Sequence, residues 1–159
     1  MDDLQKKVLS RLQNQCARRE YCIADIRKKA LKALDTDDSS AADPLIEALL
    51  KDGYLDESRY ASAFARDKSA LEGWGSVKIR FALRARGIPA SVIDAAIAGI
   101  DSERAGEKLS RLLQAKMHTL QGDPQCRIKL LKYALSRGYE YDDVRSAVAK
   151  LTSGMMGQD

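Results

Sequence analysis

The sequence has little of what strands, membrane spans or secretion signals require. Aromatic residues make up 6% of its 159 residues, and valine and threonine are also sparse, so few positions favour β-strands. Only three prolines and ten glycines interrupt the chain, which favours an all-α fold. No apolar run approaches the roughly 18 residues that a membrane-spanning helix needs. The acidic N-terminus, Met1–Leu4, precedes no apolar stretch, so we expect a cytoplasmic protein with no secretory signal and no membrane partner.

Metal ligands and catalytic groups are scarce as well. His118 is the only histidine, and the spacing of Cys16 and Cys22 misses the short interval typical of zinc sites. The odd count of three cysteines and the missing secretion signal together indicate reduced thiols. Neither a glycine-rich phosphate loop nor a nucleophile elbow is present. We therefore expect no enzyme activity, no metal and no cofactor.

The net charge of +4 is distributed unevenly along the chain. Basic residues dominate the segments 6–32, 74–86 and 104–137, whereas acidic residues gather at 35–47 and at Asp142 and Asp143. Carboxylates at helix starts are favoured by the helix dipole, so this alternation is typical of basic helices joined by acidic turns. Two interpretations stay open, an ordinary solvated surface and a surface for a negatively charged partner.

Apolar spacing divides the first third of the chain into three helices. Leucine and valine recur at helical intervals from Leu4 over residues 4–17, and isoleucine and alanine do so over residues 23–34. A third helix is expected to follow Asp43 as its N-cap, with Pro44 in the first helical position. It should end near Gly53, which can adopt the left-handed cap conformation.

Turn residues mark out further helices along the rest of the chain. Asp56 can cap a helix whose apolar stripe carries Tyr60, Phe64 and Leu71, and Asp101 or Ser102 starts another helix downstream. The remaining helices are delimited by breaks at residues 73–75, 87–89, 122–124 and 138.

Similar sequence recurs along the chain. Residues 79–88 align with 130–139 at an offset of 51, and residues 26–30 align with 79–83 at an offset of 53. Such a period indicates tandem repeats. We therefore predict three three-helix repeats over residues 1–54, 55–101 and 102–151, followed by a flexible tail over residues 152–159. They would form an elongated, curved array of repeats whose concave side binds a partner.

The middle helix of the second repeat carries candidate contact residues. If its isoleucine and leucine face inward, Arg80 and Arg84 lie together on one flank. Phe81 then points away from the apolar stripe, and either packs against the adjoining repeat or contacts a partner, since arginine and aromatic residues dominate interface energetics. Trp74, in the preceding turn, either closes that turn or anchors a partner.

Two motifs resemble the central signature of the RecX family of regulatory proteins. One is the G-Y-L-D-x-x-R-Y-A-x-x-F pattern over residues 53–64, and the other is a glycine turn followed by K-I-x-x-x-L and R-G-I over residues 75–88. Residues 129–139 are similar to that family's C-terminal repeat, and the resemblance extends over residues 18–151. One departure is that Leu34 and an acidic loop stand where the family usually has a glycine.

This resemblance implies a non-enzymatic, monomeric regulator that binds the RecA recombinase and RecA–single-stranded DNA filaments. Members of the family mostly limit the recombinase, ATPase and coprotease activities of RecA, which connects them to DNA repair and the SOS response. The expected contacts with RecA, or with single- or double-stranded DNA in the filament, are the basic residues Arg59, Arg66, Lys78, Arg80, Arg84, Arg86, Lys129, Lys132 and Arg137, with Trp74 and Phe81 as aromatic contacts.

Two other functions remain open. An isoelectric point near 9.0 and the likeness of three-helix units to helix-turn-helix modules fit an autonomous nucleic-acid-binding protein. A helical-repeat adaptor that binds neither DNA nor RecA is the other alternative.

Overall fold

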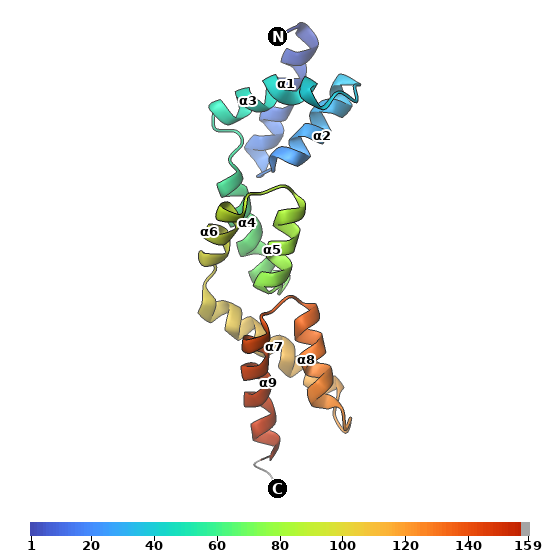
Figure 1. The fold of residues 1–159 in the computed structure, drawn as a ribbon, viewed down its shortest axis with the longest axis vertical. Helices are drawn as coiled ribbons and strands as arrows, with labels where there is room; N and C mark the ends of the chain where they lie inside the picture. Colours follow the sequence, from blue (N-terminus) through green and yellow to red (C-terminus); the bar gives the residue numbers. More distant parts are fainter. Residues whose placement is uncertain (157–159) are drawn as a thin grey trace. The chain divides into compact units, whose positions relative to one another are not determined.

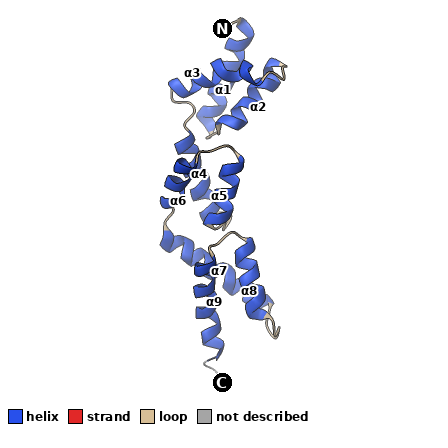
Figure 2. Ribbon diagram, viewed as in Figure 1, coloured by secondary structure: helices blue, strands red, loops and turns tan. Residues whose placement is uncertain are grey.

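The computed structural model describes residues 1–156, and most of them are helical (Figure 1; Figure 2). The helices are α1 (Asp3–Arg18), α2 (Ile23–Leu34), α3 (Asp43–Lys51), α4 (Glu57–Ala70), α5 (Ser76–Ala85), α6 (Ala90–Ala98), α7 (Ser102–Thr119), α8 (Cys126–Ser136) and α9 (Tyr141–Met156), and a short 3-10 helix, η1 (Ser39–Ala42), precedes α3. No strand occurs within residues 1–156, so the prediction of an all-α fold is confirmed.

Contacts group the chain into two compact units. One contains residues 1–63 and 83–96, and the other contains residues 64–82 and the chain from residue 97 onward. In the first unit, α1, α2 and α3 pack against one another. Their shared core includes Val8, Leu12, Ile26, Leu45 and Leu49, each at most 2% exposed. Burial of each such side chain contributes about 1.5–3 kcal/mol, so the amphipathic pattern of these helices is what stabilises this core. The division into three repeats remains a prediction.

The second unit has its own core, in which α7, α8 and α9 pack against one another. The buried side chains of this core are Leu109, Leu113, Leu130, Ala134, Tyr139, Val144 and Val148. Helix α5 contributes residues to both units: Ile79, in this unit, and Leu83, in the first, are fully buried, as the helical spacing predicted.

Two aspartates begin helices as the sequence indicated. The Asp101 carboxylate accepts hydrogen bonds from the backbone N–H groups of Glu103 and Arg104, at 3.1 and 3.2 Å. The Asp56 carboxylate accepts one from the backbone N–H of Arg59 at 3.0 Å. Both contacts satisfy donors that have no partner within the helix.

The start of α3 differs from its prediction. The N-cap is Ala42, and Asp43 already belongs to the helix, because η1 leads directly into α3. The Asp43 carboxylate instead accepts a hydrogen bond from the Arg27 guanidinium, with an Nη1–Oδ1 distance of 2.7 Å. The prediction of Asp43 as N-cap was therefore wrong by one residue.

Three predictions at helix ends also need correction. Leu4 is 51% exposed at the start of α1, outside the core. Leu71 is 75% exposed and lies just beyond α4, so it is not part of that helix's apolar stripe. Residues 152–156 continue α9 instead of forming a tail, and residues 157–159 of the predicted tail lie outside the described residues.

Asp35 takes the place of a glycine at the end of α2. Its φ and ψ are both 53°, which is the left-handed conformation, and its backbone N–H bonds to carbonyl groups in the last turn of α2. Aspartate tolerates this conformation better than most residues. Helix α2 therefore has a left-handed end without glycine before the acidic loop, and Gly87 and Gly138 have positive φ angles after α5 and α8.

Candidate partner-binding surface

Helix α5 carries an exposed aromatic side chain opposite its buried stripe. Phe81 is 74% exposed, whereas Ile79 and Leu83 are fully buried. Arg84 is exposed and Arg80 is half-buried, four residues apart on the same helix, a spacing that places side chains on one face. Of the two interpretations of Phe81, packing against an adjoining repeat is the one that this exposure contradicts.

Trp74 lies half-buried in the turn between α4 and α5. Its ring meets the ring of Phe64 edge to face, with centroids 6.2 Å apart, and its backbone N–H donates to the Lys68 carbonyl at 2.9 Å. The ammonium groups of Lys68 and Lys78 lie 4.7 and 4.5 Å from the Trp74 ring centroid. These contacts support the interpretation of Trp74 as a residue that closes the turn, and they place Lys78 against it.

Arg137 forms hydrogen bonds with backbone groups of the same chain. Its guanidinium donates hydrogen bonds to the backbone carbonyls of Glu72 and Gly73, the latter at 3.4 Å. The backbone adds two further contacts, from the N–H of Gly75 to the Arg137 carbonyl at 2.8 Å and from the N–H of Val77 to the Gly138 carbonyl at 2.9 Å. Arg137 therefore joins the α8–α9 turn to the α4–α5 turn.

Arg59 and Lys129 also have intramolecular partners. The Arg59 Nε lies 2.6 Å from Glu20 Oε1, and its Nη2 donates to the Gly53 carbonyl at 3.1 Å. This hydrogen bond with Glu20 raises the pKa of Arg59. Lys129 Nζ lies 2.5 Å from Asp123 Oδ2, and the contact lowers the pKa of Asp123. Both side chains stabilise local structure and are only partly available to a partner.

The other predicted basic contacts fall into two groups. Arg66, Arg84 and Lys132 are exposed, and no side-chain ion pair involves them within residues 1–156. Arg80 and Arg86 are half-buried and interact within the fold. Arg59 and Lys129 are exposed too but are held in ion pairs, so Arg66, Arg84 and Lys132 are the most accessible of the nine basic candidates.

Tyr21 is a second cation-flanked aromatic that the sequence analysis did not single out. Arg19 and Lys29 place their charged groups 4.6 and 5.2 Å from the centroid of its ring, within the range of cation–π attraction. The signal in the sequence was tyrosine next to the arginine pair at 18–19, with a lysine pair in the following helix. This cluster forms a basic, aromatic feature between α1 and α2, where the half-buried Tyr21 packs against the core of these helices.

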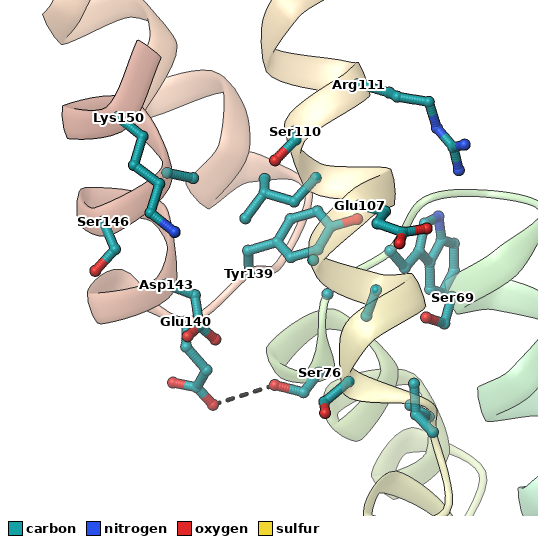
Figure 3. A pocket seen from close by; sticks show the side chains of 18 of the residues that line it. Ser69, Ser76, Glu107, Ser110, Arg111, Tyr139, Glu140, Asp143, Ser146 and Lys150 are labelled. Atoms are coloured by element: carbon teal, nitrogen blue, oxygen red, sulfur yellow. Dashed lines mark hydrogen bonds between the residues drawn. The ribbon is translucent and has the colours of Figure 1, made fainter. Parts of the chain in front are cut away.

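A pocket of about 780 Å³ lies among α7, α9 and the turns that precede α5 and α9. Figure 3 shows the Tyr139 ring in the middle of it, with Glu140 and Asp143 near the start of α9 and Ser110 on α7. Ser76 Oγ donates a hydrogen bond to Glu140 Oε1 at 3.2 Å. Trp74 in its lining was a candidate contact from the sequence, but the pocket itself was not predicted, because its lining comes from segments far apart along the chain.

The described part of the chain gives no support to a metal centre or a membrane span. No three histidine, cysteine, aspartate or glutamate side chains within it are grouped to hold a metal ion. None of its helices combines the length and apolarity needed to cross a bilayer. Burial raises the thiol pKa of both Cys16 and Cys22, which disfavours the reactive thiolate.

Comparison with known proteins connects these features to one family. The family model for the second three-helix domain of RecX matches residues 56–97, the region of α4, α5 and α6. The regulatory protein RecX of Clostridium botulinum strain Eklund 17B is 35% identical over 125 residues, which are 76% of this chain and 57% of that protein. The chain thus spans a little over half the length of the clostridial relatives it matches.

A match over most of both chains and two solved structures agree with this connection. The regulatory protein RecX of Chromohalobacter salexigens is 31% identical over 134 residues, which cover 84% of this chain and 85% of that protein. A crystal structure of regulatory protein RecX matches 90% of this chain and 70% of its own, with a TM-score of 0.79 and 25% identity. RecX from Lactobacillus salivarius has the same TM-score at 17% identity, over 95% and 98% of the two chains, and supports the fold. The chain therefore belongs to the RecX family of regulatory proteins.

Proposed function

We propose that this chain binds RecA and RecA–single-stranded DNA filaments and limits the recombinase, ATPase and coprotease activities of RecA. Membership of a family of regulatory proteins supports this function. The observation that carries it is the exposed face of α5, where Phe81 is 74% exposed beside Arg84, within the matched region 56–97. Phenylalanine and arginine are both enriched in protein–protein interfaces relative to the rest of the surface.

The proposed contacts are not equally strong candidates. Phe81 and Arg84 are the main contacts, and Arg66 and Lys132 are further candidates because they are exposed. Arg59, Lys129 and Arg137 have intramolecular partners, so their substitution would disturb the fold as well as any contact. The proposed regulator acts by binding alone, without catalysis and without a cofactor.

A RecA ATPase assay on single-stranded DNA tests this function. Substoichiometric amounts of the chain should reduce ATP hydrolysis, and the double variant Phe81→Ala/Arg84→Glu should lose that effect. Arg104→Glu is the matched control, because the Arg104 side chain is 86% exposed on α7 and has only a long contact of 3.7 Å with Asp101. Unchanged ATP hydrolysis at every ratio of wild-type chain to RecA would contradict the proposed function.

Binding to free nucleic acid is the second candidate function. The Tyr21 ring, flanked by Arg19 and Lys29, favours it, since cationic and aromatic side chains together bind phosphate and stack on bases. A salt titration on naked DNA separates the two functions. Tight binding without RecA, with a steep loss of affinity as salt rises, would favour an autonomous nucleic-acid-binding protein.

A further inference from the structure

The hydroxyl group of Tyr139 forms no hydrogen bond with the described residues. The residue is 8% exposed, and burial raises the pKa of its hydroxyl. The only hydrogen bond of Tyr139 with the described residues is made by its backbone N–H, which donates to the Ala134 carbonyl. The hydroxyl oxygen itself is not sealed from solvent, since the side-chain atoms that are both buried and unpartnered within the described residues belong to Gln15, Glu20 and Glu57. Because Tyr139 lies in the middle of the pocket (Figure 3), an occupant of the pocket can reach this hydroxyl and bond to it.

The pocket also has more acidic than basic side chains around it. Glu107, Glu140 and Asp143 line it from α7, from the turn before α9 and from α9 itself. The described residues give none of these three carboxylates an ion pair. Arg111 and Lys150 are the two cations in the lining. In a chain with a net charge of +4, unpaired carboxylates around one pocket favour a positively charged occupant.

The shape of the pocket suits part of a protein. Its volume of about 780 Å³ lies within the range of sites that enclose ligands. Gly106, in the interior of α7, faces it, and a Cβ there would meet no atom within 4 Å. A glycine within a helix is less favourable than alanine, and no contact inside the fold requires it at this position. The space beside Gly106 in the pocket is thus free to hold part of a partner protein.

We infer that this pocket binds a basic side chain, arginine or lysine, on an exposed segment of a protein partner. The cation would lie among Glu107, Glu140 and Asp143, and one of its N–H groups would donate to the Tyr139 hydroxyl. The aromatic ring of Tyr139 adds attraction for a cation above its face. If the proposed function holds, which this step assumes, the segment belongs to RecA.

A first experiment examines the pocket without RecA. In an NMR titration, N-acetyl-argininamide should shift the amide signals of residues 102–110 and 139–150 in a saturable manner, and N-acetyl-glutaminamide should not. Tyr139→Phe should weaken the arginine response severalfold without reducing thermal stability, since the hydroxyl has no partner inside the fold. Failure of the arginine titration, or an equal response to both amides, would overturn the inference whatever the outcome with RecA.

A second experiment asks whether RecA supplies the basic side chain. Glu107→Gln/Asp143→Asn should weaken binding to RecA filaments on single-stranded DNA at least fivefold. The control Asp37→Asn/Glu47→Gln removes two exposed acids elsewhere, so both variants have the same net charge of 4 + 2 = +6. Added positive charge by itself strengthens attraction to DNA phosphates, so the control should bind as tightly as the wild type or more tightly.

The outcomes of the two experiments separate the two proposals. If the wild-type chain responds to arginine but does not bind the filament, the proposed function is wrong and the pocket inference stands. If the filament binds the pocket variant as tightly as the control, RecA does not use the pocket. If the pocket variant binds the filament more weakly than the control and the wild-type chain responds to arginine, both the proposed function and the pocket inference are supported.

Discussion

Gly75 and Gly138 approach so closely that neither could carry a side chain in this arrangement. A Cβ on Gly75 would lie 2.3 Å from the carbonyl oxygen of Gly138, and a Cβ on Gly138 would lie 2.3 Å from the Cβ of Lys78. The close approach allows the N–H of Gly75 to donate to the Arg137 carbonyl at 2.8 Å. Within this unit, the α4–α5 turn and the α8–α9 turn are thus joined backbone to backbone.

Gly75→Ala should lower the free energy of unfolding by about 1–3 kcal/mol, the usual cost of forcing an extra methyl group into a packed site. The new Cβ would collide with backbone atoms, which cannot rotate away as a side chain can. Urea denaturation followed by circular dichroism measures the change. Gly106→Ala is the control, because it adds the same methyl group in open space on α7 and should raise stability by about 1 kcal/mol. Equal stabilities of the two variants would contradict the close contact.

Arg137→Met should destabilise the same junction by about 1–3 kcal/mol, because the carbonyls of Glu72 and Gly73 would lose a charged donor. Methionine preserves much of the apolar stem, so the change reports mainly on the hydrogen bonds. Trp74 fluorescence during denaturation measures it, since Trp74 directly follows Gly73. Lys132→Met removes an exposed charge from the same helix region and should change stability by less than about 0.5 kcal/mol.

Glu57→Gln should make the chain more stable than the wild type at neutral pH. Burial raises the pKa of Glu57 above its ordinary value of 4.5, and its Oε2 is buried without a hydrogen-bond partner. Because the folded pKa is the higher one, the contribution of Glu57 to stability is fully present only below its ordinary pKa of 4.5 and is lost as the pH rises through the folded pKa. The advantage of the variant should therefore grow as the pH rises above 4.5 in thermal unfolding experiments.

The contribution of Asp123 to stability depends on pH in the opposite direction to that of Glu57. The contact with Lys129 lowers the pKa of Asp123, so its contribution to stability is present above the ordinary pKa of 3.8 and is lost as the pH falls through the folded pKa. Asp123→Asn should therefore be less stable than the wild type at neutral pH, and the difference should shrink in acid. The same pH response in both variants would show that one of these two environments is wrongly described.

Phe81→Ala should change the free energy of unfolding by less than about 0.5 kcal/mol, because a side chain that is 74% exposed gives up little burial when it is removed. Leu83→Ala, two positions along α5, should cost about 2–5 kcal/mol, because Leu83 is fully buried. Thermal and urea unfolding of both variants measures the contrast. A large loss of stability in Phe81→Ala would show that this side chain packs inside the folded protein.

Much of the helical framework was predictable from local signals. The range 23–34 predicted for the second helix agrees with α2, because its apolar periodicity is unbroken until Asp35 turns the backbone. Asp56 and Asp101 cap their helices through short contacts along the chain. The start of α3 was not predictable in the same way, because η1 and the ion pair of Asp43 with Arg27, 16 residues away, decide the role of that aspartate.

The candidate surface was predictable only in part. Helical spacing correctly placed Ile79 and Leu83 inside and directed Phe81 away from them. It could not show that Arg59 and Arg137 bind groups inside the fold, because their partners Glu20 and Glu72 are 39 and 65 residues away. An arginine in the sequence is expected to be an exposed cation. Whether its guanidinium is already bound to another group of the protein depends on how distant segments pack.

The sequence by itself determined that the chain is helical, where most helices begin and end, and which family it belongs to. Those properties depend on spacing, caps and motifs that act over a few residues. Tertiary structure alone decided that Gly75 meets Gly138, that Arg137 secures the turn before α5, and that Tyr139 turns an unused hydroxyl toward a pocket. These relationships join segments more than 30 residues apart, and the close packing of side chains and backbone fixes them only once the helices have assembled.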